Sequence, residues 1–524
     1  MARLFLGLDS STQSLSAMVV DYDSREVVYE DSIVFDEALP SYGTENGVLR
    51  NPDPKIVHSP PLMWVEALDF VFGKMHGAGV DLGSVLAISG SGQQHGSVYM
   101  NAGAMDALQG LDAGKTLAEN LSGVFSRKTS PIWMDSSTAE ECREIMEALG
   151  GLRATAEATG STTFERFTGP QIRKFTKADR EAYEETAHIA LVSSFMASII
   201  AGKIAPIDQG DGAGMNLMDI RSRTWHSGAL EATAPDLRAR LPALVPSASV
   251  IGTVCAYFAE KYGLNGQALA LAWSGDNPNS VIGVGLVKPG MVAISLGTSD
   301  TYFGFMKECH TDPKGEGHVF GAPTGDYMTL ICFKNGSLAR EKVRDACGLG
   351  WDGFSAALRS TPPGNHGKIM LPYFEPEIVP KVLEPGVRRF NLDEDDADAN
   401  CRAVVEAQMM SMRLHSAWMG VRPSRIHATG GASQNPEILR VMADVQNCPV
   451  YRFEVSNSAV LGAALRAAQA YLVESGESPA WEEVVAGFAD PVAGSMIEPD
   501  PEAARVYDDL VETYAECERE ATGR

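Results

Sequence analysis

Three short polar turns, each following an apolar stretch, contain the residue types that bind phosphates and magnesium. The first begins at Asp9 and continues through Ser11 and Thr12, the second is Gly297–Ser299, and the third is Ala428–Asn435. Small hydroxyls and glycine amides hold polyphosphates without side-chain bulk, and a lone carboxylate at a strand end suits Mg²⁺, which keeps several of its waters. Taken singly, each segment is also compatible with an ordinary turn, because Asp and Ser hydrogen-bond to nearby backbone groups.

The elements that must position these turns occur twice along the chain. An apolar strand, a polar turn and a second apolar strand make up both residues 4–20 and residues 290–306. The two copies are separated by more than half of the chain, far outside the periods of solenoid repeats, so we interpret them as a duplicated domain. We place the boundary near residues 250–265, which gives an N-terminal domain of residues 1–258 and a C-terminal domain of residues 259–524.

Strand patterns and helix patterns alternate in both halves. Strands are predicted over residues 84–92 and 268–273, and a helix over residues 136–151. Either Ser136 or Ser137 is a suitable N-cap for this helix, and a pair of glycines ends it. This alternation predicts an α/β fold.

Composition limits the class of protein. The chain has 524 residues, of which 44% are hydrophobic and 21% charged, as in a globular protein with more than one large domain. A formal net charge of −25 argues against a nucleic-acid partner. The eight cysteines are scattered and form no zinc or disulfide pattern. We find no signal peptide and no apolar run of membrane-spanning length, so we expect a cytoplasmic protein without a membrane partner.

Other catalytic patterns are incomplete or absent in the sequence. The segment Ala113–Thr116 reads AGKT, but only three residues separate Gly110 from Gly114, one fewer than a P-loop requires. In SGSGQQHG, His95 occupies the position of the third glycine of a dinucleotide-binding fingerprint. The sequence contains neither the His-Glu-x-x-His pattern of metalloproteases nor a Gly-x-Ser-x-Gly elbow after a strand.

Four separated motifs, taken in order, resemble those of the FGGY carbohydrate kinases of the actin-like ATPase superfamily. They are GSGQQHGS at Gly90–Ser97, SGDNP at Ser274–Pro278, SLGTSDT at Ser295–Thr301 and ATGGASQN at Ala428–Asn435. The resemblance is greatest to the members that phosphorylate D-xylulose, and it covers nearly the whole chain. It implies two α/β domains of the ribonuclease H-like type with a cleft between them, ATP and Mg²⁺ as cofactors, and the sugar D-xylulose as substrate. We expect a monomer or a homodimer.

The resemblance also implies a catalytic base and a sugar site. Asp276 in SGDNP matches the base that takes the proton from the sugar hydroxyl, and it also contacts the sugar. The other matched sugar-binding residues are Gln94, His95, Arg166 and Asn277. Without the resemblance, Asp276 is a turn aspartate at a helix start, and His95 is a structural histidine.

Further matches concern the phosphates, the nucleotide and the metal. The matched phosphate-binding residues are Ser11, Thr12, Gln13, Gly297 and Thr298. The matched nucleotide-binding residues are Trp351, Gly430, Gly431, Ala432 and Asn435, with the tryptophan beside the adenine. Asp9 is the expected carboxylate of the Mg²⁺ site. Considered alone, a tryptophan is more often part of a core.

Two positions depart from the family pattern, and two other functions stay open. Ser11 and Asp300 stand where the first and second phosphate loops usually have glycine. Because serine disfavours positive φ, we expect a slightly different path for the first loop. The alternatives are a kinase for another ketose or polyol, such as ribulose, glycerol or gluconate, and a nucleotide-switched binding protein of the actin or Hsp70 type.

Overall fold

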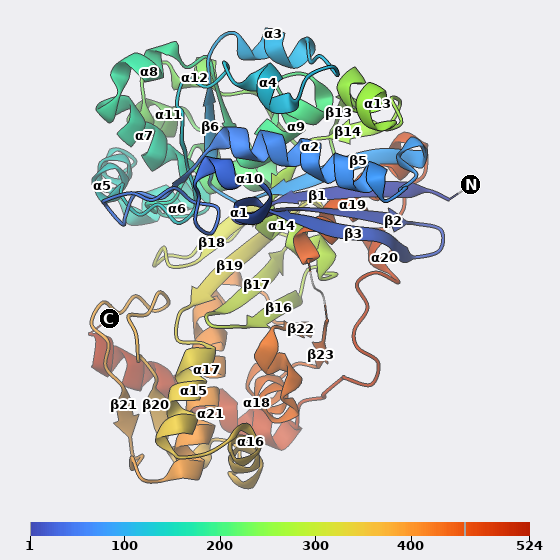
Figure 1. The fold of residues 1–524 in the computed structure, drawn as a ribbon. Coiled ribbons are helices and arrows are strands. Elements are labelled where there is room, and N and C mark those ends of the chain that lie inside the picture. The colour runs from blue at the N-terminus through green and yellow to red at the C-terminus, as the bar shows by residue number, and fades with distance from the viewer. Residues whose placement is uncertain (1, 455–456, 524) are drawn as a thin grey trace. The chain divides into compact units, whose positions relative to one another are not determined.

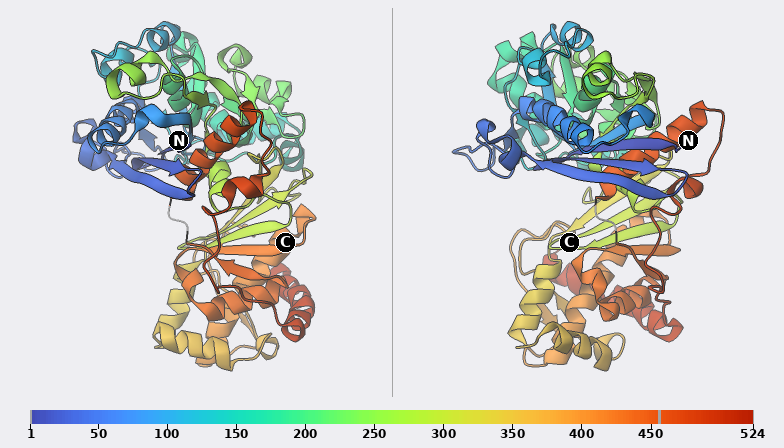
Figure 2. Two further views of the ribbon diagram at one scale, coloured as in Figure 1. Left: turned by 90° about the vertical axis from the view of Figure 1, so that its right-hand side faces the viewer. Right: turned by 45° about the vertical axis from the view of Figure 1, so that its right-hand side comes forward.

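The computed structural model describes residues 2–454 and 457–523, which fold into two compact units (Figures 1 and 2). Each unit is built around one main mixed sheet with helices packed on it. The first unit contains residues 2–287, 319–327 and 457–489, and the second contains residues 288–318, 328–454 and 490–523.

The sheet of the first unit begins with the N-terminal apolar strand. Its strands are β1 (Leu4–Ser10), β2 (Ser14–Asp21), β3 (Glu26–Val34), β5 (Val85–Gly92), β13 (Val250–Thr253), β14 (Leu269–Leu271) and β15 (Ser274–Gly275). Their order is β13–β14–β5–β1–β2–β3, with β15 also pairing with β5. β1 is antiparallel to β2 and parallel to β5. Leu4, Phe5, Leu6 and Leu8 are all buried, as their unbroken apolar run predicts.

The sheet of the second unit repeats this arrangement. Its strands are β16 (Met291–Leu296), β17 (Asp300–Met306), β19 (Tyr327–Phe333), β22 (Arg425–Thr429) and β23 (Val450–Arg452). They are ordered β19–β17–β16–β22–β23, and β16 is antiparallel to β17 and parallel to β22. Both sheets therefore start with a hairpin whose first strand lies parallel to a later strand. This confirms the predicted duplication and the α/β fold.

Helices pack on the first sheet. α2 (Pro61–Gly77) contacts β2 and β3, α9 (Val192–Ala201) contacts β1 and β5, and α19 (Ser458–Glu474) contacts β1, β2 and β5. All residues of α9 from Val192 to Ile200 are buried. The most apolar helix of the first unit is therefore buried in its core.

Glycines allow an unusually close approach between α19 and its neighbours. A Cβ atom on Gly462 of α19 would lie 1.9 Å from the carbonyl oxygen of Asn279 in α14 (Asp276–Gly283), and one on Gly283 would lie 1.9 Å from the carbonyl oxygen of Ser458. A Cβ atom on Gly7 of β1 would lie 2.2 Å from the carbonyl oxygen of Val460. α19 therefore fixes both β1 and α14, the two elements that hold Asp9 and Asp276.

The compact units divide the chain differently from the expected domains 1–258 and 259–524. Residues 259–287, including Asp276, belong to the first unit, and so does α19. The physical reason is that β14 continues the first sheet beside β5, and α14 packs on α19. Apolar periodicity alone does not distinguish the last strands of one sheet from the start of the next. The expected cleft between the domains stays a prediction.

The predicted helix near residues 136–151 begins later than expected. It is α5 (Ala139–Ala148), and its N-cap position is Thr138. Ser137 does not cap it, because both its backbone N–H and its hydroxyl donate to Asp135 Oδ1, at 3.0 and 2.5 Å. These bonds hold Ser137 in the preceding turn.

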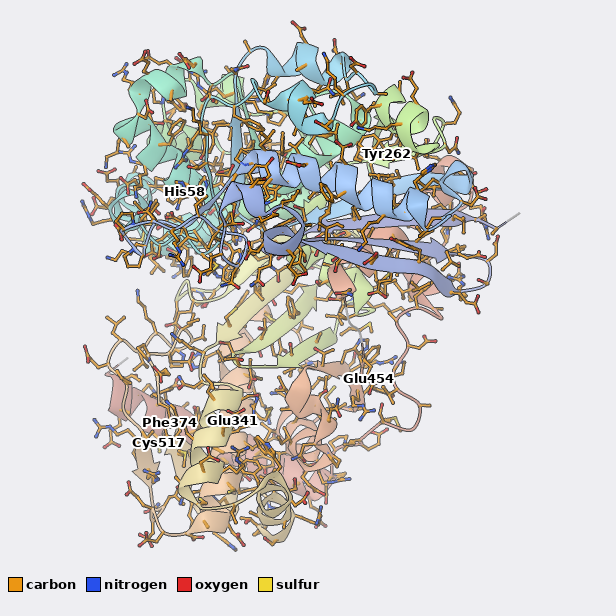
Figure 3. The ribbon with its side chains drawn as sticks, in the orientation of Figure 1. His58, Tyr262, Glu341, Phe374, Glu454 and Cys517 are labelled. Atoms are coloured by element: carbon orange, nitrogen blue, oxygen red, sulfur yellow. The ribbon has the colours of Figure 1, made fainter. Side chains whose placement is uncertain are left out.

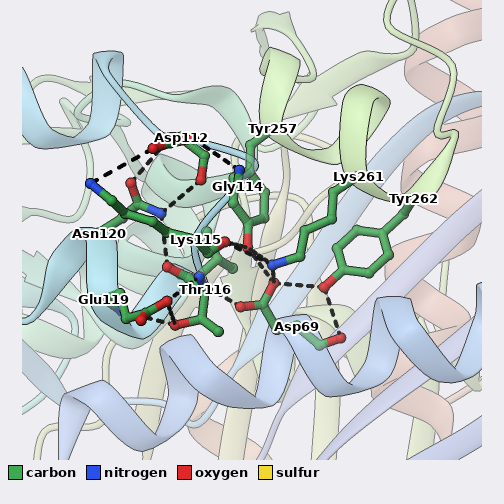
Figure 4. A network of polar contacts seen from close by, with 11 residues as sticks. Asp69, Asp112, Gly114, Lys115, Thr116, Glu119, Asn120, Tyr257, Lys261 and Tyr262 are labelled. Carbon is green, nitrogen blue, oxygen red and sulfur yellow. Dashed lines mark hydrogen bonds and ion pairs between the residues drawn. The ribbon is translucent and has the colours of Figure 1, made fainter.

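The AGKT segment at Ala113–Thr116 forms a helix cap (Figure 4). Its last residue forms a capping box with Glu119 at the start of α4 (Leu117–Leu121). The carbonyl oxygen of Lys115 accepts hydrogen bonds from Lys261 Nζ at 2.8 Å and from the Tyr257 hydroxyl at 3.1 Å, which ties the segment to α13 (Ala256–Tyr262). The segment follows the helix α3 (Ala104–Gln109), whereas a P-loop follows a strand.

The remaining helices and strands complete the two units, and none of the helices within residues 2–454 and 457–523 is long and apolar enough to cross a membrane. The helices are α1 (Phe35–Ala38), α3 (Ala104–Gln109), α6 (Leu152–Thr159), α7 (Thr168–Ala178), α8 (Arg180–Glu185), α10 (Gln209–Gly212), α11 (Ser227–Thr233), α12 (Leu237–Arg240), α15 (Ser337–Ala346), α16 (Trp351–Ser360), α17 (Ala397–Ser416), α18 (Pro436–Gln446), α20 (Trp481–Val485) and α21 (Pro501–Thr522). The strands are β4 (His58–Ser59), β6 (Ser97–Met100), β7 (Ser130–Pro131), β8 (His188–Leu191), β9 (Ile207–Asp208), β10 (Met218–Asp219), β11 (Thr224–Trp225), β12 (Leu244–Val245), β18 (His318–Gly321), β20 (Ile369–Leu371) and β21 (Arg388–Phe390).

We predict that Gly462→Ala destabilises the protein by about 3 kcal/mol or more, because the added methyl group meets the backbone of α14 and the two helices must separate. Gly73→Ala is the matched control. Gly73 is also a helical glycine, but it is exposed and a Cβ atom there meets nothing within 4 Å, so alanine adds about 0.5 kcal/mol of stability. Urea unfolding followed by circular dichroism measures both. Equal effects of the two substitutions would contradict the close-packing account.

Candidate active site

The carboxyl ends of neighbouring strands meet at one edge of the first sheet. β5 is parallel to both β1 and β15, and Ser91 of β5 is the register partner of Asp9 in β1 and of Ser274 in β15. This register brings together Asp9 and the residues that follow β5 and β15. Ligands of open α/β sheets bind at such an edge. The predicted residues found here are Asp9, Gln94, His95, Asp276 and Asn277.

Asp276 opens α14 with a half-buried carboxylate. Its Oδ1 accepts hydrogen bonds from the backbone N–H of Asn277 at 2.8 Å and of Gln94 at 3.3 Å. Burial, followed by repulsion from the Asp9 carboxylate, raises the pKa of Asp276 to about 7. Asp276 therefore changes its charge near neutral pH, which is the range in which a general base is effective.

Asp9 has a carboxylate oxygen without a hydrogen-bond partner. Burial raises the pKa of Asp9, and the neighbouring Ser91 hydroxyl partly offsets this rise. Its Oδ1 is buried and accepts no hydrogen bond from any residue that the structure describes. A desolvated carboxylate oxygen in this condition fits a cation or a tightly bound water. The described residues contain no cluster of three or more His, Cys, Asp and Glu side chains arranged as a metal site. Mg²⁺ does not require one where phosphates and water supply its other ligands.

His95 is a neutral, oriented imidazole. Its ring stacks on Phe167 with centroids 4.3 Å apart and an interplanar angle of 24°. Nδ1 lies 2.8 Å from the carbonyl oxygen of Gly214, which can only accept, so Nδ1 carries the proton. Burial, and then the positive charge of Arg166, lower the pKa of His95 to about 3. The neutral ring therefore offers Nε2 as a hydrogen-bond acceptor, a role that suits a sugar hydroxyl.

Two adjacent glutamines present buried amide donors. Asn277 Nδ2 donates to Gln94 Oε1 at 2.7 Å, and Thr12 Oγ1 donates to Gln93 Oε1 at 3.4 Å. The Nε2 atoms of Gln93 and Gln94 are both buried and have no hydrogen-bond partner within the part of the chain that the structure describes. Buried donors of this kind predict a polar ligand. Sequence analysis missed Gln93, although the repeated glutamine directly after β5 was an available signal.

Arg166 lies beside the aromatic residues that support His95. Its guanidinium carbon is 5.2 Å from the centroid of the Phe164 ring and 5.8 Å from that of Phe167. Its charge acts on His95, as the lowered pKa of the imidazole indicates. The structure therefore brings Arg166 together with the sugar-site residues that the resemblance implies.

The first phosphate loop closes through the Ser11 side chain. The backbone N–H of Ser11 donates to the Ser14 carbonyl at 2.9 Å, and the Ser14 N–H donates to Ser11 Oγ at 3.3 Å. Ser11 is not among the described residues with positive φ. A serine turn thus replaces the left-handed conformation for which glycine is favoured. Gln13, two residues after Ser11, is exposed.

Trp133 contacts the first phosphate loop and was missed from the sequence. Its indole N–H donates to Thr12 Oγ1 at 2.8 Å, and its side chain is exposed. The sequence around Trp133 has no spacing that connects it to residue 12, so only the fold could identify it. Gly47 also packs on this loop, because a Cβ atom there would lie 2.0 Å from the carbonyl oxygen of Thr12.

In the second unit, the corresponding loop joins β16 to β17. The Gly297 carbonyl accepts a hydrogen bond from the Ser337 N–H at 2.8 Å, and Thr298 and Ser299 are exposed. Asp300, which replaces the usual glycine, is fully buried in an ion pair with Arg340. The loop therefore presents its glycine and hydroxyls, while its carboxylate points into the unit.

A pocket of about 460 Å³ in the second unit contains four of the five predicted nucleotide residues. Trp351, Gly431, Ala432 and Asn435 line it, together with residues of α15 such as Glu341, which is labelled in Figure 3. Gly430 does not line the pocket. A Cβ atom at this position would lie 2.6 Å from the carbonyl oxygen of Leu296, so Gly430 packs on β16 instead.

Trp351 is a surface residue of this pocket and not part of a core. Its side chain is 42% exposed, and the guanidinium carbon of Arg344 lies over the ring at 4.4 Å from its centroid. Asn435 is fixed by its side-chain N–H, which donates to Ser355 Oγ at 2.9 Å. An exposed indole supported by a cation is suited to stacking on a flat aromatic ligand.

Comparisons with known proteins identify the family of the chain. Residues 129–283 match the model of the N-terminal domain of the FGGY family of carbohydrate kinases, and residues 292–471 match that of its C-terminal domain. The gap between these two ranges includes the border between the compact units. Xylulose kinase 2 of Arabidopsis thaliana is 46% identical over 491 residues, which cover 90% of this chain and 87% of that protein. Xylulose kinase of Rattus norvegicus is 43% identical over 528 residues, which cover 99% and 97%.

Solved structures share the fold of this chain. The crystal structure of xylulose kinase from Rhodospirillum rubrum superimposes with a TM-score of 0.82 at 20% identity and covers 98% of each chain. The two matched domain models and the identities above 40% over most of the chain show that this chain belongs to the FGGY family of carbohydrate kinases.

We predict that Asp276→Asn stabilises the protein in a pH-dependent manner. The folded state holds the Asp276 proton up to about pH 7, whereas an unfolded aspartate loses it near pH 4, so stability decreases as pH rises through this window. Asparagine removes this loss. At pH 8 the free energy of unfolding should therefore rise by on the order of 2 kcal/mol, and the difference should vanish toward pH 4.

Urea unfolding at several pH values measures this effect. Asp106→Asn is the control, because Asp106 is an exposed aspartate of α3 and the substitution makes the same change in charge. A gain that is equal at every pH, or equal in the two variants, would show that Asp276 does not have a raised pKa.

Proposed function

We propose that this protein transfers the γ-phosphoryl group of ATP to D-xylulose and so forms D-xylulose 5-phosphate. The observation that supports this most is the half-buried Asp276 carboxylate, which titrates near neutral pH beside buried amide donors that lack partners among residues 2–454 and 457–523. The relatives named xylulose kinase, at 43% and 46% identity over most of the chain, support xylulose as the sugar.

Asp276 acts as the general base in this proposal. The terminal hydroxyl of the sugar donates a hydrogen bond to the Asp276 carboxylate, whose position is held by the backbone N–H groups of Asn277 and Gln94. The hydroxyl oxygen forms a bond to the γ-phosphorus while the bond from that phosphorus to the β,γ-bridging oxygen breaks, and the hydroxyl proton passes to Asp276. In a loose transition state this proton leaves late, so orientation of the hydroxyl is the main contribution.

Other residues at this edge of the first sheet form hydrogen bonds with the hydroxyl groups of the sugar. Neutral His95 accepts a hydrogen bond from a sugar hydroxyl at Nε2, and Gln94 donates a hydrogen bond through its buried Nε2. Asn277 and Arg166 complete the set of donors. A site that leaves its own polar groups unpaired when a hydroxyl is missing or inverted discriminates strongly between sugars.

The polyphosphate and the nucleotide are assigned to the turns and the pocket. Ser11, Thr12 and Gln13 contact phosphate from the first unit, and Gly297 and Thr298 do so from the second. Trp351, Gly431, Ala432 and Asn435 hold the nucleoside, with the indole beside the adenine, and Gly430 packs the turn at Gly431 against β16. Asp9 would hold Mg²⁺, directly or through water, because its buried Oδ1 has no other partner among the described residues. When bound, Mg²⁺ supplies charge neutralisation at the phosphates.

Two alternative functions have less support. A kinase for ribulose, glycerol or gluconate would use the same base and phosphate loops, so only the sugar-reading residues distinguish it. A nucleotide-switched protein of the actin or Hsp70 type needs neither a carboxylate that titrates near pH 7 nor buried amides beside it. A monomeric or homodimeric state and a cytoplasmic location stay predictions.

We predict a strong preference for D-xylulose in a substrate panel. ADP release in a coupled assay is measured with D-xylulose, D-ribulose, L-ribulose, glycerol and gluconate, each with Mg·ATP. The kcat/KM for D-xylulose should exceed each of the others by about 100-fold, because a mismatched hydroxyl leaves buried polar groups unpaired. A higher value for any other sugar would overturn the proposed substrate, and ATP hydrolysis that no sugar stimulates would favour the switch function.

We predict that the reaction requires the ionised form of Asp276. The kcat/KM for D-xylulose should decrease as pH falls through about 7, because protonated Asp276 cannot accept the hydroxyl proton. Asp276→Asn should reduce kcat by about 1,000-fold or more and abolish this pH dependence, while binding of Mg·ADP measured by calorimetry stays unchanged. Asp106→Asn serves again as the control and should behave like the wild type. Retained turnover in Asp276→Asn would exclude it as the base.

A further inference from the structure

The second phosphate loop ends on a buried ion pair. The side chains of Asp300 and Arg340 are both 0% exposed, and Arg340 Nη1 and Nη2 donate to Asp300 Oδ2 and Oδ1 at 2.7 and 2.9 Å. Burial raises the pKa of Asp300, whereas the guanidinium and the Gly297 backbone amide favour its charged form. Buried ion pairs add little net stability because both partners lose their hydration. Stability alone therefore does not account for this pair.

Arg340 also connects the loop to two helices. It donates to Gln408 Oε1 of α17 at 2.7 Å and to Ser337 Oγ at the start of α15 at 2.9 Å. Gln408 Nε2 in turn donates to the carbonyl oxygens of Asn335 and Gly336 at 2.7 and 3.0 Å. A single guanidinium thus fixes the turn before α15 and the end of the phosphate loop in one arrangement.

The fixed turn lies directly against the phosphate loop. Ser337, which also lines the nucleotide pocket, donates its backbone N–H to the Gly297 carbonyl at 2.8 Å. A Cβ atom on Gly336 would lie 2.8 Å from both the Thr298 carbonyl oxygen and the Asp300 backbone nitrogen. A movement of the turn by even a fraction of an ångström therefore displaces the loop.

We propose that Asp300 and Arg340 are a positioning pair that holds the second phosphate loop in the conformation that binds Mg·ATP. The proposal rests on the proposed kinase function. Asp300 anchors the end of the loop, and Arg340 both holds this anchor and cancels its negative charge, which would otherwise repel phosphate. The glycine usual at this position could supply neither the anchor nor the charge pair, so Asp300 replaces conformational freedom with a long-range tether.

The test separates nucleotide handling from sugar handling. In Arg340→Gln, the buried Asp300 carboxylate loses its cation, and we expect the KM for Mg·ATP to rise by about tenfold or more and Mg·ADP binding to weaken equally. The KM for D-xylulose at saturating Mg·ATP, and D-xylulose binding to the free protein, should stay within about twofold. Asp300→Asn, which keeps the side-chain shape, is the milder variant should Arg340→Gln fail to fold. It should raise the KM for Mg·ATP in the same direction.

The matched control is another buried carboxylate of the second unit. Glu518 pairs with His415 at 3.0 Å, both residues are buried, and neither lines the nucleotide pocket. Glu518→Gln should lower the unfolding temperature without changing the KM for Mg·ATP. If the Asp300 and Arg340 variants also change only the unfolding temperature, the positioning proposal is wrong. If wild-type protein fails to bind Mg·ADP at all, the kinase function itself is wrong, so the two failures are distinguishable.

Discussion

The structure around the candidate site of the first unit depends on the electrostatic repulsion between the Asp9 and Asp276 carboxylates. The parallel register of β1, β5 and β15 brings both carboxylates to one sheet edge, where burial already disfavours their charge. The backbone amides of Gln94 and Asn277 offset part of this cost at Asp276. The remainder of the cost appears as the raised pKa of the Asp276 carboxylate. An arrangement of lower energy would have a lower pKa at Asp276, so folding stability is given up to keep this pKa near neutral.

The two predicted phosphate loops are each closed by hydrogen bonds, but from different parts of the chain. The first is closed locally, because the Ser11 hydroxyl bonds to the backbone of Ser14 three residues later. The second is closed at long range, through the guanidinium of Arg340 forty positions beyond Asp300. In both loops a glycine from another segment, Gly47 or Gly336, packs against a loop carbonyl. Each loop therefore lacks the usual glycine, at Ser11 or Asp300, and is contacted by a glycine from another segment of the chain.

Much of this could be predicted from the sequence, for identifiable reasons. The strand–turn–strand repeat, the α/β class and the groups around Asp9, Asp276 and Trp351 depend on local patterns, which the family motifs reinforce. The division of the chain was not predictable in this way, because the assignment of α14 to the first unit depends on packing against α19, far along the chain. Trp133 and Arg340 were missed for the same reason, since each reaches its loop only through the fold. Gly430 lies outside the pocket because it packs against Leu296 of β16, a neighbour that a motif does not reveal.

The dependence of β1 and α14 on α19 has a consequence for biosynthesis. The strand that bears Asp9 is synthesised long before α19, yet the surface that covers Gly7 is made only when residues 458–474 emerge from the ribosome. Until then the sheet of the first unit exposes an apolar face, and α14, the helix that bears Asp276, lacks the helix against which it packs. Transiently exposed apolar surface makes incompletely folded chains prone to aggregation, which chaperones counteract. A chain cut short before α19 would therefore be both inactive and prone to aggregate.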